Sequence, residues 1–238
     1  MKNLFIAIVF LSMSVYCVNA HALSYTSLGF DYNADIQTYG FISGSLFPEG
    51  DLTLGGVPFS VPSGTDLNIW HSEIGSTSGS KSLSVDIGLS GVDKVYTIIN
   101  TYWGESSPGS FAYIEFEGAG GAYYQYLLDG NFNIRDYFGG TYTNSLTSPD
   151  AANVWTQSGI RLDMQTIDLP DAFLFEDQIA MTLVDNGATG FQRTFLYGLT
   201  VGTQNGGGGP STVPEPATII LLGAGLLGLA GIRRKMTS

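Results

Sequence analysis

Two glutamates in the segment Phe111–Glu117 have the types and spacing for acid–base chemistry. Glu115 and Glu117 are two residues apart, so on a β-strand they share one face, with Cα atoms about 6.6 Å apart. This separation loosely fits the carboxylate pair of a glycoside hydrolase. It is more typical of the solvent face of an amphipathic strand, with Ile114 and Phe116 facing inward. We favour the second interpretation and expect no enzyme activity.

The chain has too few histidines for histidine-dependent catalysis. Of the two histidines, His21 lies in a segment that we expect to be removed on export, which leaves His71. A serine triad or a histidine-rich zinc site needs more imidazoles than that. His71 and Glu73 lie two residues apart and can share a strand face, but two ligands do not make a zinc site. The sequence therefore predicts no catalytic residues.

Four acids gather in one short segment: Asp168, Asp171, Glu176 and Asp177. Their carboxylate oxygens are ligands that a hard cation such as calcium prefers. The segment is not an EF-hand loop, and clustered acids in a loop are more often simply solvated. One structural calcium ion is the only cofactor that we consider here, with solvated acids as the alternative.

Aromatic rings beside turns are the side chains best suited to binding a sugar. Tyr102 and Trp103 end a candidate strand directly before the loop 104–109, which places at least one ring at a loop mouth. A flat ring can stack on the apolar face of a sugar. Arg135 and Asp136 offer a guanidinium and a carboxylate that can share the hydroxyls of one sugar. The alternatives are rings that fill the core and an ion pair that braces the fold.

The elements that must position these residues are strands. Period-two apolar patterns with turn residues between them recur along the body of the chain. At least eight short strands with little helix fit an antiparallel two-sheet β-sandwich of jelly-roll type. We therefore predict an all-β fold. The clearest candidate strands lie at 83–89, 94–101, 111–117, 123–128, 160–165, 179–183 and 195–201.

The sandwich, predicted at residues 23–204, has the size of one domain with a proper core. Between residues 24 and 213 the chain carries five basic and twenty acidic residues. Such a surface repels nucleic acid and anionic lipid headgroups, and it suits calcium or neutral glycans. The one cysteine of the chain, Cys17, precedes this domain, so we expect no disulfide, thiol nucleophile or cysteine metal site.

The amino-terminal segment 1–22 has the three parts of a secretory signal peptide. Lys2 forms the basic region, Leu4–Val18 is apolar, and Ala20-His21-Ala22 fits an Ala-x-Ala cleavage site. We therefore expect the chain to engage the Sec machinery and signal peptidase, and to be exported with cleavage after the second alanine.

The carboxy-terminal segment 213–238 begins with Pro214-Glu215-Pro216 and continues into an uncharged apolar run, 217–232. As a helix these 16 residues cover about 24 Å, a little less than the roughly 30 Å hydrocarbon core. Arg233, Arg234 and Lys235 follow, which favours the cytoplasmic side for this end. A Gly/Ser/Pro linker, 205–212, keeps the motif clear of the sandwich. We predict a short transmembrane helix preceded by an exposed motif.

This tail resembles the PEP-CTERM sorting signal of Gram-negative bacteria, in which a Pro-Glu-Pro motif, a membrane helix and an arginine cluster are recognised by exosortase. The matching residues are Pro214, Glu215, Pro216, the apolar run, Arg233 and Arg234. The resemblance implies transient anchoring in the inner membrane, processing by exosortase, and delivery to the cell surface or an extracellular polysaccharide matrix. An uncleaved single-pass anchor is the alternative.

The segments Tyr123–Tyr142 and Phe195–Val201 resemble a β-sandwich that recurs in exported PEP-CTERM proteins. More distantly, this body is similar to carbohydrate-binding modules of the galactose-binding type. These resemblances imply a surface or matrix protein whose sandwich binds glycan or exopolysaccharide. The alternatives are a structural biofilm or surface protein without a defined ligand, and a secreted glycoside hydrolase.

Overall fold

The computed structural model describes residues 23–39, 47–64, 66–72, 79–102, 111–139, 143–187 and 193–204. These ranges contain β-strands and one short 3₁₀ helix, so the predicted all-β class is confirmed. The elements are β1 (Leu23–Ser27), β2 (Gly50–Leu54), β3 (Val57–Val61), β4 (Trp70–His71), β5 (Lys81–Asp86), β6 (Val92–Tyr102), β7 (Ala112–Gly118), β8 (Tyr123–Leu128), β9 (Ala151–Gln157), β10 (Ile160–Asp168), η1 (Asp171–Phe175), β11 (Ile179–Asp185) and β12 (Arg193–Gln204).

The predicted signal peptide 1–22, the linker 205–212 and the sorting tail 213–238 lie outside the described residues. Within the described ranges, no helix is long and apolar enough to cross a membrane. The predicted transmembrane helix 217–232 therefore stays a prediction from the sequence.

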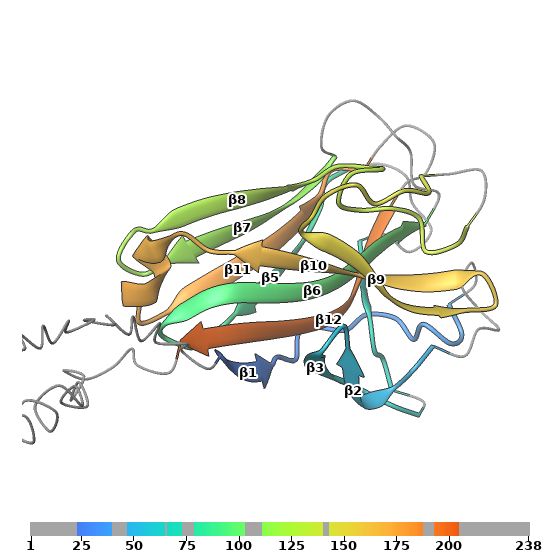
Figure 1. Ribbon diagram of the computed structural model, residues 1–238, viewed down its shortest axis with the longest axis horizontal. Coiled ribbons are helices and arrows are strands. Elements are labelled where there is room, and N and C mark those ends of the chain that lie inside the picture. The colour runs from blue at the N-terminus through green and yellow to red at the C-terminus, as the bar shows by residue number, and fades with distance from the viewer. Residues whose placement is uncertain are drawn as a thin grey trace, which may run out of the picture.

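The strands form three layers, and all of their pairings are antiparallel (Figure 1). A central sheet has the order β1-β12-β6-β10-β9, with β4 also pairing with β12. A four-stranded sheet, β5-β11-β7-β8, covers one of its faces, and the β2–β3 hairpin covers the other. The two sheets fit the predicted sandwich, to which the structure adds the hairpin layer. The finer jelly-roll assignment stays a prediction.

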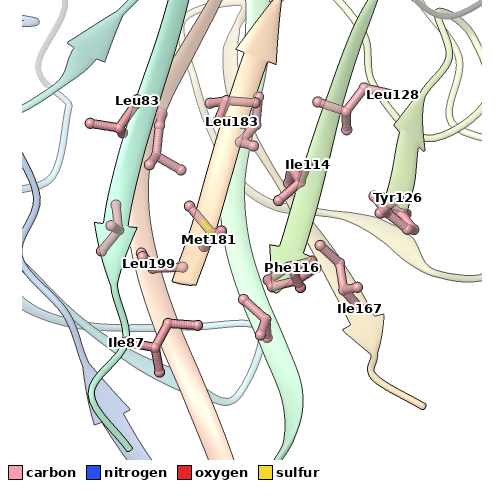
Figure 2. Close-up of a cluster of buried hydrophobic side chains, with 14 of the residues drawn as sticks. Leu83, Ile87, Ile114, Phe116, Tyr126, Leu128, Ile167, Met181, Leu183 and Leu199 are labelled. Atoms are coloured by element: carbon pink, nitrogen blue, oxygen red, sulfur yellow. The ribbon is translucent and has the colours of Figure 1, made fainter. Parts of the chain in front are cut away.

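A first hydrophobic core fills the space between the central and the four-stranded sheet. Along β7, Ile114 and Phe116 are fully buried, whereas Glu115 and Glu117 point to the outer side. Figure 2 shows these two apolar side chains in one cluster with others from β5, β8 and β11 and with Ile167 and Leu199 of the central sheet. The structure thus supports the prediction that the two glutamates lie on the solvent face of an amphipathic strand.

A second hydrophobic core lies between the central sheet and the β2–β3 hairpin. The hairpin contributes Val57 and Phe59, and the central sheet contributes Ile98, Phe195 and Tyr197. Because both faces of the central sheet are covered, β6 and β12 are buried along almost their whole length, with little alternation between buried and exposed positions.

The hairpin packs tightly against the central sheet at Gly198. The register between β12 and β6 shifts between Leu196 and Gly198, which is the mark of a β-bulge. A Cβ atom at position 198 would lie 2.8 Å from Cδ1 of Phe59. The missing side chain therefore makes room for the phenylalanine ring and lets the hairpin close over the sheet.

Candidate functional site

At one end of the central sheet, β6 and β10 separate, and the loop segment that contains Arg135 and Asp136 lies between them. β6 and β10 pair regularly only as far as Ile98 and Met164. Beyond this point the Thr101 N–H donates to the Arg135 carbonyl (3.0 Å), and the Tyr137 N–H donates to the Thr101 carbonyl (2.8 Å). The segment that carries both predicted sugar-binding residues Arg135 and Asp136 is therefore built into the sheet.

Arg135 forms a bidentate ion pair with Asp163 of β10. Its Nε and Nη2 each donate to a carboxylate oxygen at 2.7 Å. Asn100 of β6 donates from Nδ2 to the same carboxylate at 2.8 Å and accepts the Asp163 N–H at 2.9 Å. Asp163 is fully buried, and the Arg135 side chain is 14% exposed. The pair closes the point at which the two strands separate.

Asp136 is buried and belongs to the same structural network. Its Oδ1 accepts the Phe138 N–H at 2.8 Å, and its backbone carbonyl accepts Nε of Arg161 at 2.7 Å. Burial is the main cause that lowers the pKa of Arg161, and the nearby charge of Arg135 lowers it further. Arg135 therefore pairs with Asp163 and not with its neighbour Asp136, and the predicted sugar-binding pair is replaced by an ion pair that braces the fold.

Tyr102 also lies inside the protein. Its side chain is 4% exposed, and its ring stacks on His71 with centroids 4.7 Å apart. Tyr102 is therefore not a ring at a loop mouth. Trp103, the other candidate for that position, lies outside the described residues, so the expectation of at least one such ring stays a prediction. Tyr39, which packs against the second core, lies against both rings, with its centroid 4.5 Å from that of His71 and 6.5 Å from that of Tyr102.

The four acids proposed as calcium ligands have separate surroundings. Asp168 pairs with Lys94 of β6, Asp171 begins η1, and Asp177 is exposed. Glu176 folds onto the turn between β7 and β8, where it accepts the N–H groups of Gly120 and Ala122. No group of three or more histidine, cysteine or acidic side chains within the described ranges is placed to hold a metal ion. The calcium site stays a prediction without structural support.

Glu115 and Glu117 lie on the open outer face of the four-stranded sheet. Glu115 Oε1 accepts the Tyr123 hydroxyl at 2.8 Å and Nε2 of Gln125 at 3.0 Å. The bond to Glu115 is the main cause that raises the pKa of Tyr123. A glycoside hydrolase places its two carboxylates on either side of the scissile bond. Here the two glutamates lie side by side on one strand, so they do not enclose a bond between them.

A polar groove lies between the end of β1 and the β2–β3 hairpin. Its volume is about 540 Å³, and its lining is made of Ser27, Leu28, Gly29, Tyr32, Gly50, Asp51, Ser60, Val61, Pro62 and Ser63. Three bonds hold its walls. The Leu28 N–H donates to the Leu199 carbonyl at 2.9 Å, the Ser60 N–H donates to Ser27 Oγ at 2.8 Å, and Ser60 Oγ donates to the Asp51 carboxylate at 2.9 Å.

Tyr32 provides the aromatic surface of this groove. Its ring lies against Phe30, with centroids 4.3 Å apart, and Gly29 lies beside its hydroxyl. Burial raises the pKa of the Tyr32 hydroxyl. A tyrosine hydroxyl is protonated at neutral pH and can donate a hydrogen bond. The groove thus combines a fixed ring, an exposed carboxylate from Asp51 and several serine hydroxyls, the groups that recognise a polyhydroxylated ligand.

Sequence reasoning missed these groove residues. The hairpin itself carries a readable signal, because Leu52, Leu54, Val57 and Phe59 alternate around Gly55-Gly56. Both glycines adopt positive φ, as two-residue hairpin turns require. No local pattern, however, indicates that this hairpin meets residues 27–32.

Comparison with protein families shows a match at the tail. The family model for the PEP-CTERM protein-sorting motif matches residues 212–235. This confirms the predicted motif, which includes Pro214, Glu215, Pro216, Arg233 and Arg234, and it supports an exported chain that exosortase sorts at the membrane. No curated protein matches the chain, and no solved structure does. The match covers the tail alone and carries no information about a ligand of the sandwich.

Replacing Asp163 with alanine should lower the free energy of unfolding by about 3–5 kcal/mol, because it leaves the largely buried Arg135 without its counter-charge. Urea denaturation of the two proteins measures this loss. The control is Asp177→Ala, which removes an exposed acid and should change stability by less than about 0.5 kcal/mol. Equal effects of the two substitutions would show that the ion pair does not brace the sheet.

His71 should make folding sensitive to mild acid. Burial, and next the charge of Arg193, lower its pKa from the usual 6.5 to about 3. Between these values the unfolded chain binds a proton that the folded chain excludes, so this contribution to stability is complete above pH 6.5 and is lost as the pH falls toward 3. The free energy of unfolding should fall by about 1 kcal/mol between roughly pH 7.5 and 5.5.

The matched variant for this prediction is His71→Gln, measured by urea denaturation at the same two pH values. Its absolute stability is not the readout, because the substitution also changes packing. The pH-dependent loss should be much smaller than in the parent chain. An undiminished loss would assign the acid sensitivity to other groups.

Proposed function

We propose that this chain is an exported, exosortase-processed surface or extracellular-matrix protein whose sandwich binds a neutral glycan in the groove beside Tyr32. The tail match supports export and sorting at the membrane before surface display. Glycan binding is the further step. The observation that carries it is the groove, in which Tyr32, Asp51, Ser60 and Ser63 lie together on one concave surface.

The size of the groove suits one or two sugar rings. Its volume of about 540 Å³ falls within the range of roughly 300–1,000 Å³ that is usual for small-molecule sites. The ring of Tyr32 offers an apolar surface for the C–H face of a sugar, while the Asp51 carboxylate accepts hydroxyl protons. Backbone at Gly29 and Gly50 borders the same space without side chains that would narrow it.

Charge favours a neutral ligand over an anionic one. Twenty acidic and five basic residues lie between positions 24 and 213, and Asp51 adds a negative charge to the groove itself. An anionic polysaccharide would meet repulsion both at long range and at the site. A neutral exopolysaccharide avoids both costs, and it is the ligand class that we assign.

Two other functions receive less support. A structural surface protein without a ligand would not need the ring of Tyr32 on a concave surface. A glycoside hydrolase would need two carboxylates on either side of a bound sugar. Glu115 and Glu117 share one open strand face, and His71 is buried, so the described residues do not supply such a site.

Replacing Tyr32 with alanine should weaken binding of a neutral oligosaccharide at least about tenfold, because the stacking surface is lost. A glycan array identifies the sugar, and calorimetry measures the affinity. The control is Tyr123→Ala, which removes an exposed ring from the opposite layer and should leave the affinity unchanged. Asp51→Asn keeps an acceptor for Ser60 and should cause a smaller loss. Unchanged binding by the Tyr32 variant would exclude the groove.

The sorting motif is tested separately from the groove. Replacing Pro214, Glu215 and Pro216 together by alanine removes the motif but keeps the apolar run and the arginines. The chain should then remain in the inner-membrane fraction at its unprocessed size, as immunoblots of cell fractions would show. Alanine at Pro210 and Ser211, which lie just outside the matched range, is the control and should be processed normally. Normal processing of the triple variant would contradict recognition by exosortase.

A further inference from the structure

β8 forms one edge of the four-stranded sheet, where no further strand among the described residues pairs with it (Figure 1). Its pairing with β7 is set by the bond from the Gly118 N–H to the Ala122 carbonyl at 2.8 Å. Because antiparallel pairs alternate, the backbone groups of Tyr123, Gln125 and Leu127 point away from β7. Only the Leu127 carbonyl receives a described bond there, from Asn133 Nδ2 at 2.7 Å.

The composition of this edge is unusual for a strand that stays unpaired. Soluble proteins protect such edges with charged side chains, proline or bulges. The six residues of β8, Tyr-Tyr-Gln-Tyr-Leu-Leu, include none of these, and its register with β7 is regular.

Other described edges of the two sheets are protected. β5 carries Lys81 and Asp86, β9 is bulged opposite Leu162 and Asp163, and β1 is held by the bond from Ser60 to Ser27.

We infer that β8 is a self-association edge, and that a second copy of this chain pairs with it antiparallel. The pairing is self-complementary about Gln125, which faces its own counterpart. Tyr123 of each copy then faces Leu127 of the other, and these two side chains are 56% and 45% exposed in the single chain. Such a two-fold contact uses the same residues on both copies and joins the two four-stranded sheets into one.

Electrostatics favours β8 as the place where two copies meet. Each copy is strongly acidic, so contacts elsewhere bring like charges together. β8 is uncharged, and Glu115 of β7 is the carboxylate opposite Gln125, one strand further in. Three strand spacings separate Glu115 from its counterpart, or about 14 Å, which exceeds the Debye length of about 8 Å at physiological salt. The repulsion across this contact is therefore largely screened.

Disulfide trapping in the full chain tests this pairing. With Cys17 replaced by serine, Gln125→Cys places two thiols on facing residues whose Cα atoms are about 5.5 Å apart, a distance that a disulfide spans. Mild copper–phenanthroline oxidation followed by non-reducing electrophoresis measures the dimer. The control, Ser84→Cys, puts an exposed thiol on the same outer face but on β5. The dimer fraction of Gln125→Cys should exceed that of the control by about tenfold.

A second substitution tests whether the trapped dimer depends on edge pairing. Leu127→Lys, added to Gln125→Cys, places a charge at an exposed edge position and should reduce the dimer to the control level. Its thermal melt should match that of the parent, because Leu127 is not part of the core. Equal trapping of the Gln125 and Ser84 variants, trapping that Leu127→Lys does not reduce, or cross-linking to an unrelated protein in place of a second copy would each overturn the inference. None of these outcomes depends on glycan binding in the groove.

Discussion

Coverage of the central sheet on both faces is the constraint on which the rest of the structure depends. The four-stranded sheet covers one face and the β2–β3 hairpin covers the other, so β6, β10 and β12 run through the interior. A polar group on these strands costs free energy on burial unless it finds a hydrogen-bond partner inside the protein. The ion pair between Arg135 and Asp163 follows from this requirement, as do the bonds of Asn100 with the same carboxylate.

The same layering separates the interior from the surfaces that are open to ligands. Arg135 and Asp136, which were predicted to bind a sugar, have structural roles instead. The loop that carries them lies between β6 and β10 and is hydrogen-bonded to both strands. The outer layers remain accessible. The hairpin layer forms the groove with Tyr32, and the four-stranded sheet presents an open face and the uncharged edge of β8. The proposed ligand groove and the inferred self-association edge thus lie on opposite layers of the fold.

Local sequence patterns identified much of the fold but little of the groove. Alternation in β5, β7 and β11 correctly marked which side chains face the first core, because each of these strands has one solvent face. β6 and β12 are buried on both faces, so their patterns could not indicate which neighbour covers each side. Tyr102 ends such a strand, and nothing in its sequence context distinguishes a ring covered by a second layer from one exposed at a loop.

The sequence by itself determined the strand-rich body, its acidic charge, its lack of cysteine and the sorting motif at 212–235. These properties depend on composition or on residues adjacent in the chain. Tertiary structure alone decided that Arg135 pairs with Asp163, that Glu176 caps a turn formed by residues 118–122, and that Ser27 meets Ser60. Each of these contacts joins residues far apart in the chain. Their selection depends on how whole layers pack, a property that no local spacing encodes.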